Sequence, residues 1–256
     1  MVRVGLVGCG TIGSAMARAL QRTYAHAARL VALHDLDETR AHILQRSLHP
    51  RPIITSLSDL IRRSDLVLEA ASAGIAADVA ARSLRAHRDV LVMSVGGLLM
   101  SASWRQALRR SRARLHIPSG ALAGLDGIKA MALGRIRRVT LTTRKPPHAL
   151  GRTNRKPAVV FDGNARDVVK AFPQNTNVAA ALTLAAGISP ARPRIRVIAD
   201  PSIQRNRHEV ELEGDCGRIS CRIESRPSKN PKTSELAVRS AVAALGRLFD
   251  PVQIGT

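Results

Sequence analysis

Short apolar runs alternate with amphipathic stretches through the first 117 residues of the chain. This rhythm is typical of parallel strands that are covered by helices, as in successive βαβ units. The apolar runs predict strands at residues 3–7, 30–34, 53–54, 65–69, 89–93 and 115–117. The amphipathic stretches predict helices at residues 11–22, 37–47, 56–63, 74–86 and 101–112, with Gly96 and Gly97 as a break between elements.

The rhythm changes after Pro118, where small residues at 119–124 form a loop that leads into a helix. Apolar and polar positions then alternate with a period of two, which is typical of half-buried strands. We expect these strands at residues 138–143, 159–161, 194–199, 207–213 and 217–224, and helices at 165–171, 177–186 and 234–249. Residues 144–157 are interpreted as a polar connector. The pattern predicts a second domain of mixed α+β type.

The composition is strongly basic. The 256 residues include 40 Lys and Arg against 19 Asp and Glu, which gives a formal net charge of +21. Such an excess suggests nucleic-acid binding, because clustered cations neutralise phosphates. The basic residues are instead spread along the chain, and Tyr24, Trp104 and three phenylalanines are too few for a base-stacking surface. Nucleic acid is therefore not the expected partner.

Membrane and disulfide signals are also missing from the sequence. No apolar run of about 18 residues occurs, and the N-terminus enters the first strand without a charged leader. Cys9, Cys216 and Cys221 are odd in number and lack CxxC spacing, so we expect neither a disulfide framework nor a metal site. Cys9 is expected to fill a tight turn as a small side chain. These features predict a cytoplasmic protein.

The sequence Gly8-Cys9-Gly10-Thr11-Ile12-Gly13 fits the pattern GxGxxG and lies between the first strand and the first helix. In that context the glycines permit a tight turn, the approach of a pyrophosphate, and close packing of helix and strand. Asp35 follows Gly13 by 22 residues, where a carboxylate can accept the adenosine-ribose hydroxyls. The motif predicts a dinucleotide site formed by Gly8, Gly10, Thr11, Ile12, Gly13 and Asp35. Asp35 favours NAD, and Arg40 leaves NADP open.

Other polar residues gather in the second half of the chain. Asn175 and Asn177 precede a helix, and capping of that helix is the simpler explanation for both. His208 lies early in a strand, and a single histidine is more often packed than catalytic. A serine or threonine cap also explains the segment 227–235, although Lys232 there could hold a carboxylate.

Longer motifs resemble a known family. They are the glycine motif, the segments 119–126, 164–166 and 172–180, Asn206-Arg207-His208-Glu209, and Asn230-Pro231-Lys232-Thr233-Ser234. This set, which spans the chain, resembles L-aspartate dehydrogenases. The sequence departs from the family pattern at Cys216, where we expect an aromatic residue, at Ser225, where we expect Asn, and in a shorter connector before Val159.

The resemblance implies oxidation of L-aspartate to iminoaspartate with NAD or NADP, and then release of oxaloacetate and ammonia or a route into NAD biosynthesis via quinolinate. It implies that His208 is the active-site histidine and that Ala121 and Asn177 contact the cofactor. It also implies a fold: a Rossmann-type domain over 1–117, onto which residues 231–256 pack back, and a catalytic and dimerisation domain over 118–230. A homodimer is expected on the same ground.

The implied chemistry needs proton transfer and carboxylate recognition. An imidazole, with an ordinary pKa of about 6.5, suits transfer of the amine proton or activation of the water that attacks the imine. We expect His208 to do one or both. Candidate donors to the substrate carboxylates are Ser119, the backbone of 120–123, Lys232 and Thr233.

Three alternatives stay open from the sequence. The first is another two-domain reductase of the dihydrodipicolinate or homoserine dehydrogenase type. The second is a basic nucleic-acid-binding protein on a dehydrogenase scaffold, and the third is a regulator that binds NAD without turnover. Under the enzymatic hypotheses, the excess positive charge would attract anionic substrates, an effect that salt weakens.

Overall fold

The computed structural model describes residues 1–172, 177–228, 230 and 233–255. The chain divides into two compact units. Unit 1 contains Met1–Pro118 and Val238–Gln253, and unit 2 contains Ser119–Ala237 and the last residues of the chain. Among the described residues, no helix is long and apolar enough to cross a membrane.

Unit 1 is built on a six-stranded sheet whose paired strands are all parallel, with the order β3-β2-β1-β4-β5-β6. The strands are β1 (Val2–Val7), β2 (Ala28–His34), β3 (Ile53–Ile54), β4 (Leu66–Glu69), β5 (Asp89–Val92) and β6 (Leu115–His116). The helices are α1 (Thr11–Arg22), α2 (Glu38–Arg46), α3 (Leu57–Arg63), α4 (Ala73–Arg85), α5 (Val95–Leu99), α6 (Ser103–Arg109) and α10 (Glu235–Phe249). This order confirms the predicted Rossmann-type sheet.

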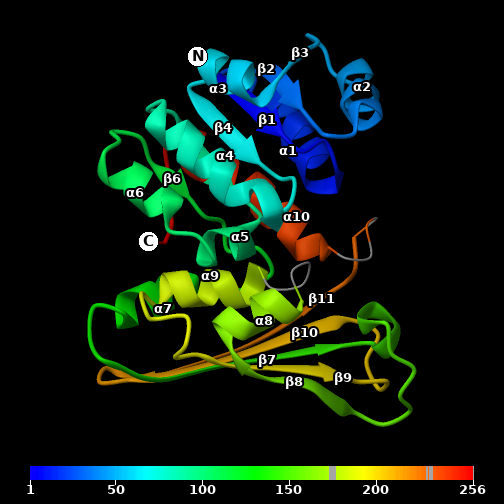
Figure 1. Ribbon diagram of the computed structural model, residues 1–256, viewed down its shortest axis with the longest axis vertical. Coiled ribbons are helices and arrows are strands. Elements are labelled where there is room, and N and C mark those ends of the chain that lie inside the picture. Colours follow the sequence, from blue (N-terminus) through cyan, green and yellow to red (C-terminus); the bar gives the residue numbers. More distant parts are fainter. Residues whose placement is uncertain (173–176, 229, 231–232, 256) are drawn as a thin grey trace. The chain divides into compact units, whose positions relative to one another are not determined.

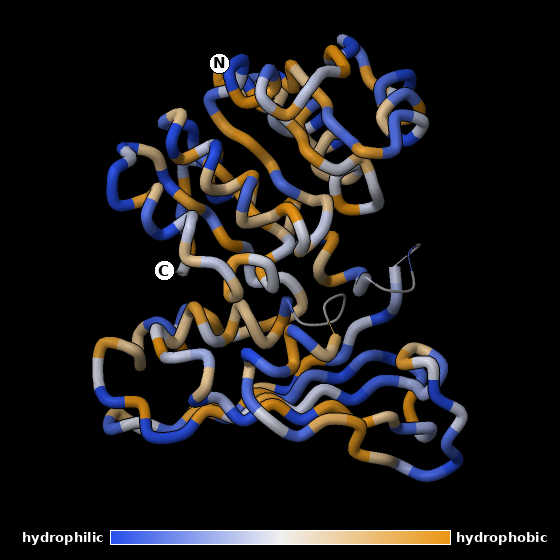
Figure 2. The backbone as a smooth tube through the Cα atoms, viewed as in Figure 1, coloured by the Kyte–Doolittle hydropathy of each residue, from blue (hydrophilic) through white to orange (hydrophobic). Residues whose placement is uncertain are grey.

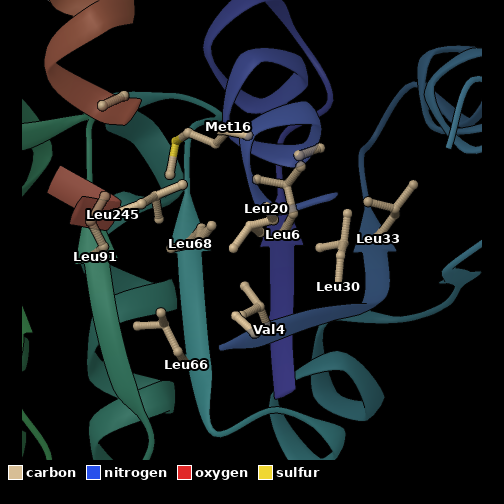
Figure 3. Packing of buried hydrophobic residues seen from close by; sticks show 14 of the residues in the cluster. Val4, Leu6, Met16, Leu20, Leu30, Leu33, Leu66, Leu68, Leu91 and Leu245 are labelled. Atoms are coloured by element: carbon tan, nitrogen blue, oxygen red, sulfur yellow. The ribbon is translucent and has the colours of Figure 1, made fainter. Parts of the chain in front are cut away.

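The core of unit 1 joins the sheet to helices from both ends of the chain. Leu6 and Leu68 from the strands pack with Met16 and Leu20 of α1 and with Leu245 of α10 (Figure 3). Leu245 is completely buried, and burial of a leucine stabilises a fold by about 1.5–3 kcal/mol. The C-terminal helix therefore returns to the first unit, as predicted.

One predicted break is wrong. The structure continues helically through Gly96 and Gly97 as α5, which packs against α4. A Cβ on Gly97 would lie 2.1 Å from the carbonyl oxygen of Ala73. The glycine therefore permits a close approach of two helices, whereas the sequence pattern suggested the end of an element.

Unit 2 contains a five-stranded mixed sheet with the order β11-β10-β7-β9-β8. The strands are β7 (Ile136–Lys145), β8 (Ala158–Asn164), β9 (Arg194–Ala199), β10 (Asn206–Gly214) and β11 (Gly217–Ser225). Strands β7 and β9 are parallel, and the other pairs are antiparallel. The helices α7 (Leu125–Met131), α8 (Ala165–Ala171) and α9 (Asn177–Ala185) lie on one side of the sheet (Figure 1), and a short 3₁₀ helix, η1, spans Pro147–Leu150.

The strands of unit 2 alternate as predicted. Val210 and Leu212 of β10 are buried, whereas the alternate residues Glu211 and Glu213 are charged, and Glu213 pairs with Arg138 of β7 at 2.8 Å. Figure 2 shows hydrophobic and hydrophilic residues mixed along these strands. One face of the sheet is therefore buried and the other is charged.

Candidate active site

The turn between β1 and α1 is built from glycine backbone. Gly8 has a φ of +95°, and a Cβ there would lie 2.6 Å from the backbone of Ala70 and Ala71. A Cβ on Gly13 would lie 1.9 Å from the carbonyl oxygen of Gly8, so no side chain fits at either position. A Cβ on Gly10 would meet open space.

This arrangement fits a pyrophosphate. Gly10 precedes α1, and no side chain of the described residues caps that helix. The amino end of α1 therefore offers backbone N–H groups and the positive end of the helix dipole beside open space. The glycine spacing is the one that a bound dinucleotide needs.

Asp35 follows β2 and contacts the same turn. Its Oδ2 accepts a hydrogen bond from the Cys9 N–H at 2.7 Å, and its Oδ1 accepts one from the Asp37 N–H at 2.9 Å. A carboxylate has about four acceptor positions, so acceptor capacity remains for ribose hydroxyls. Arg40, the cation that left NADP open, pairs with Asp37 at 3.0 Å.

Cys9 fills the turn as predicted. Its side chain is buried, and burial raises the pKa of the thiol to about 12. The group therefore stays protonated at neutral pH and packs as a small apolar side chain.

His208 lies on β10 in unit 2, on the face of the sheet that is buried. It is 4% exposed, and its cross-strand neighbour on β7 is Thr143. The His208 Nδ1 and the Thr143 Oγ1 lie 3.0 Å apart, a hydrogen bond that fixes the orientation of the ring.

Lys145 lies two residues beyond Thr143 in β7 and therefore shares its face of the sheet. It is 6% exposed, and burial lowers the pKa of its ammonium group to about 8. Burial also lowers the pKa of His208 to about 4, and the positive charge of Lys145 adds to that effect. His208 is therefore neutral at pH 7, which corrects the expectation of an imidazole with its ordinary pKa.

Two more buried polar residues complete this group. Asn206 precedes His208 by two residues in β10, and its cross-strand partner in β11 is Ser225. We call Thr143, Lys145, Asn206, His208 and Ser225 the polar cluster. Buried polar side chains in such numbers are costly unless they bind one another or a ligand, so their concentration marks a candidate site.

The other predicted residues occupy loops and helix ends of unit 2. Ser119 is half-buried beside Gly120, which has a φ of +63°, and Ala121 is buried. Asn177 is exposed and begins α9. The backbone N–H of Thr233 donates to the carbonyl of Asn230 at 2.9 Å.

Two predicted positions, Asn175 and Lys232, lie outside the described residues. The cap of α10 is described: the Ser234 hydroxyl accepts a hydrogen bond from the Ala237 N–H at 3.1 Å. The serine at the start of the last helix therefore caps it, as expected.

Sequence reasoning missed Lys145 and Thr143 as site residues. The strand predicted from the sequence ends at residue 143, so Lys145 falls within the predicted connector, residues 144–157. Continued period-two alternation through Leu141, Thr143 and Lys145 was the available signal, since it places all three on one face.

Comparisons with known proteins agree with this architecture. A family model described as "Homoserine dehydrogenase, NAD binding domain" matches residues 8–118, and one described as "Aspartate dehydrogenase, C-terminal" matches residues 126–248. L-aspartate dehydrogenases from Methanosarcina barkeri and Methanosarcina acetivorans are each 41% identical to the chain, and the matches cover 100% of both partners.

A solved structure is similar throughout as well. The crystal structure of aspartate dehydrogenase from Thermotoga maritima matches with a TM-score of 0.80 and 23% identity, over 100% of both chains. That likeness supports the fold, and the more similar sequences support the family. The resemblance inferred from the motifs is confirmed: the chain belongs to the aspartate dehydrogenase family.

Proposed function

We propose that the protein is an L-aspartate dehydrogenase, an oxidoreductase that converts L-aspartate to iminoaspartate with NAD or NADP. The observation that carries this proposal is the polar cluster, in which a buried histidine and a buried lysine lie within the part of the chain that matches the aspartate dehydrogenase model. That match also favours aspartate over the homoserine and dihydrodipicolinate alternatives. The iminoaspartate then either hydrolyses to oxaloacetate and ammonia or feeds quinolinate synthesis.

The cofactor contacts are part of the proposal. The backbone of Gly8, Gly10, Thr11, Ile12 and Gly13 would hold the pyrophosphate, and Asp35 would bind the adenosine ribose. Ala121 and Asn177 are proposed as further contacts. When bound, the oxidised nicotinamide supplies the acceptor for the hydride that leaves the substrate Cα.

Lys145 is the better base for the substrate ammonium group. The amine must lose a proton before hydride leaves Cα, and efficient proton transfer needs a base whose pKa lies near the working pH. With a pKa of about 8, Lys145 meets this requirement, whereas His208, at about 4, is a weak base. The carboxylates of bound aspartate would raise both values, because opposite charge favours the protonated forms.

His208 remains the proposed catalytic histidine. In the neutral state it can accept a proton from the water that attacks the imine, while Thr143 holds the ring in place. Ser119, the backbone of 120–123, Lys232 and Thr233 are proposed donors to the substrate carboxylates.

A spectrophotometric screen tests the proposed activity. The purified chain is incubated with NAD⁺ or NADP⁺ and with L-aspartate, D-aspartate, L-glutamate or L-homoserine, and reduction is followed at the nicotinamide absorbance. L-aspartate should give the highest kcat/KM. Turnover of homoserine with no turnover of aspartate would overturn the assignment.

A cytoplasmic homodimer belongs to the same proposal. All three cysteines are free thiols, which fits a reducing compartment. Light scattering on the eluting peak of a sizing column should give twice the monomer mass of 27.5 kDa. A monomeric peak with full activity would contradict the dimer.

A further inference from the structure

Glu69 is a buried carboxylate that the proposed chemistry does not use. It is the last residue of β4, and its side chain has no exposed surface. In the sheet of unit 1, β2 and β3 are added on one side of β1, and β4, β5 and β6 are added on its other side. The order in which the strands are added therefore changes side between β1 and β4. Open α/β sheets bind their ligands at the carboxyl ends of the strands beside such a reversal, and Glu69 lies at that end.

The Glu69 carboxylate holds two loops at once. Its Oε1 accepts a hydrogen bond from the Ala71 N–H at 2.9 Å, and its Oε2 accepts one from the Ser94 N–H at 3.0 Å. Ala71 belongs to the loop after β4, and Ser94 lies between β5 and α5. One side chain therefore ties together the segments that follow two neighbouring strands.

The peptide bond between Ala70 and Ala71, which Glu69 holds, also packs against the glycine turn. A Cβ on Gly8 would lie 2.6 Å from the carbonyl group of Ala70 and from the nitrogen of Ala71, so these backbones are in direct contact. The Ala70 N–H, in the preceding peptide, donates to the Val7 carbonyl at 2.8 Å, which attaches this segment to the end of β1. Displacement of this peptide would change the position of Gly8.

A carboxylate at this depth is costly, because its charge loses contact with water. Burial accordingly raises the pKa of the Glu69 carboxyl, and the hydrogen bonds from Ser94 and Ala71 oppose that shift. An apolar residue would fill the volume without the cost but would leave the N–H groups of Ala71 and Ser94 without this acceptor, and the bond to Ser94 is buried.

We propose that Glu69 is a positioning residue for the dinucleotide: by fixing the peptide that packs against Gly8, it sets the affinity of the phosphate-binding turn for NAD(P). The inference rests on the proposed binding of NAD(P) by unit 1 and is independent of which amino acid is oxidised. Glu69 acts through the backbone and need not touch the cofactor.

The variant Glu69→Gln tests this role with almost no change in shape. Its amide oxygen accepts from one of the two N–H groups, while its NH₂ faces the other, so one of these donors loses its acceptor. We expect the Kd for NADH, measured by fluorescence titration without substrate, to rise about tenfold. The KM for NAD⁺ should change more than kcat, and amide hydrogen exchange should become faster at Ala71 and Ser94.

A control separates positioning from general stability. Leu66 is buried at the other end of β4, so Leu66→Ala should lower the Tm at least as much as Glu69→Gln while the Kd for NADH stays unchanged. Wild-type affinity in Glu69→Gln, or an equal loss of affinity in Leu66→Ala, would overturn the inference. A wild-type chain that binds neither NADH nor NADPH would overturn the proposed function and this inference with it.

Discussion

The nucleotide-binding edge of unit 1 and the polar cluster of unit 2 are built in opposite ways. The first consists of backbone, and it depends on the absence of side chains at Gly8 and Gly13. The second consists of side chains from three neighbouring strands, β7, β10 and β11. Thr143 and His208 are separated by 65 residues in the sequence, whereas the glycine turn is one continuous segment, residues 8–13.

The contrast assigns different tasks to the two regions. A backbone site recognises a cofactor that many enzymes share, because N–H groups and a helix terminus suit any pyrophosphate. A side-chain site supplies titratable groups whose pKa values depend on burial and on each other. We therefore expect substitutions in the polar cluster to change chemistry, and substitutions in the glycine turn to change binding and stability.

The largest effect is expected at His208. His208→Ala should lower kcat by about 10²–10⁴, the usual contribution of an acid–base group. The Kd for NADH should stay unchanged, because His208 belongs to none of the proposed cofactor contacts. Thr143→Val, which removes only the hydrogen bond to the ring, serves as the intermediate case. Unchanged turnover in His208→Ala would remove the histidine from the mechanism.

Most of the fold could be predicted from the sequence, because its signals are local. The helix α1 begins and ends at Thr11 and Arg22, as the periodicity predicted, and Ser56 caps α3 through the Asp59 N–H. Gly97 shows the limit of such signals, because a glycine in a sequence can indicate either the end of an element or a close contact between two helices. Here the close approach of the Ala73 backbone, known only from the structure, shows that the contact is the reason for the glycine.

The candidate site was predicted less completely. The spacing of Gly8, Gly10 and Gly13 is sufficient to recognise a dinucleotide site, since one turn contains all of it. His208 was selected by family resemblance, and Lys145 was missed. Their proximity depends on the pairing of β7 with β10, which no local pattern encodes, and their pKa shifts depend on burial by the complete unit.

Lys145→Met tests the division of roles within the polar cluster. In the wild type, kcat/KM should rise as the pH increases through about 8, because the neutral amine is the base. The variant should lose this rise and about 10² in kcat. An unchanged pH profile would return the role of base to His208.

The same variant, Lys145→Met, should lower activity but raise the free energy of unfolding at pH 7. The folded-state pKa of Lys145, about 8, lies below the ordinary value of 10.5, so the unfolded chain binds more protons between these pH values. The free energy of unfolding of the wild type should therefore gain a contribution from Lys145 as the pH rises through this window. Lys145→Met should lack that gain and be more stable at pH 7, as measured by urea denaturation at both ends of the window.

Two glycine variants test the glycine turn of unit 1. Gly8→Ala should lower the free energy of unfolding by about 1–3 kcal/mol, because it places a Cβ at positive φ against backbone. Gly10→Ala meets open space and should leave stability within about 0.5 kcal/mol, while the Kd for NADH rises because the methyl group occupies the path of the pyrophosphate. Equal effects of the two variants on stability would contradict this distinction.

The smallest effect on activity is expected from the net charge, which is nearly the same in the two units. Unit 1 carries 19 basic and 9 acidic side chains and unit 2 carries 21 and 10, so the excess is +10 in one and +11 in the other. An excess shared so evenly predicts a general attraction for anions, which fades as added salt shortens the Debye length from about 30 Å at 0.01 M to about 8 Å at 0.15 M. Over that range kcat/KM for aspartate should fall severalfold through KM, with kcat unchanged. A kcat/KM that is insensitive to salt would leave the charge without a catalytic role, and the chemistry would then depend on the polar cluster and the glycine turn alone.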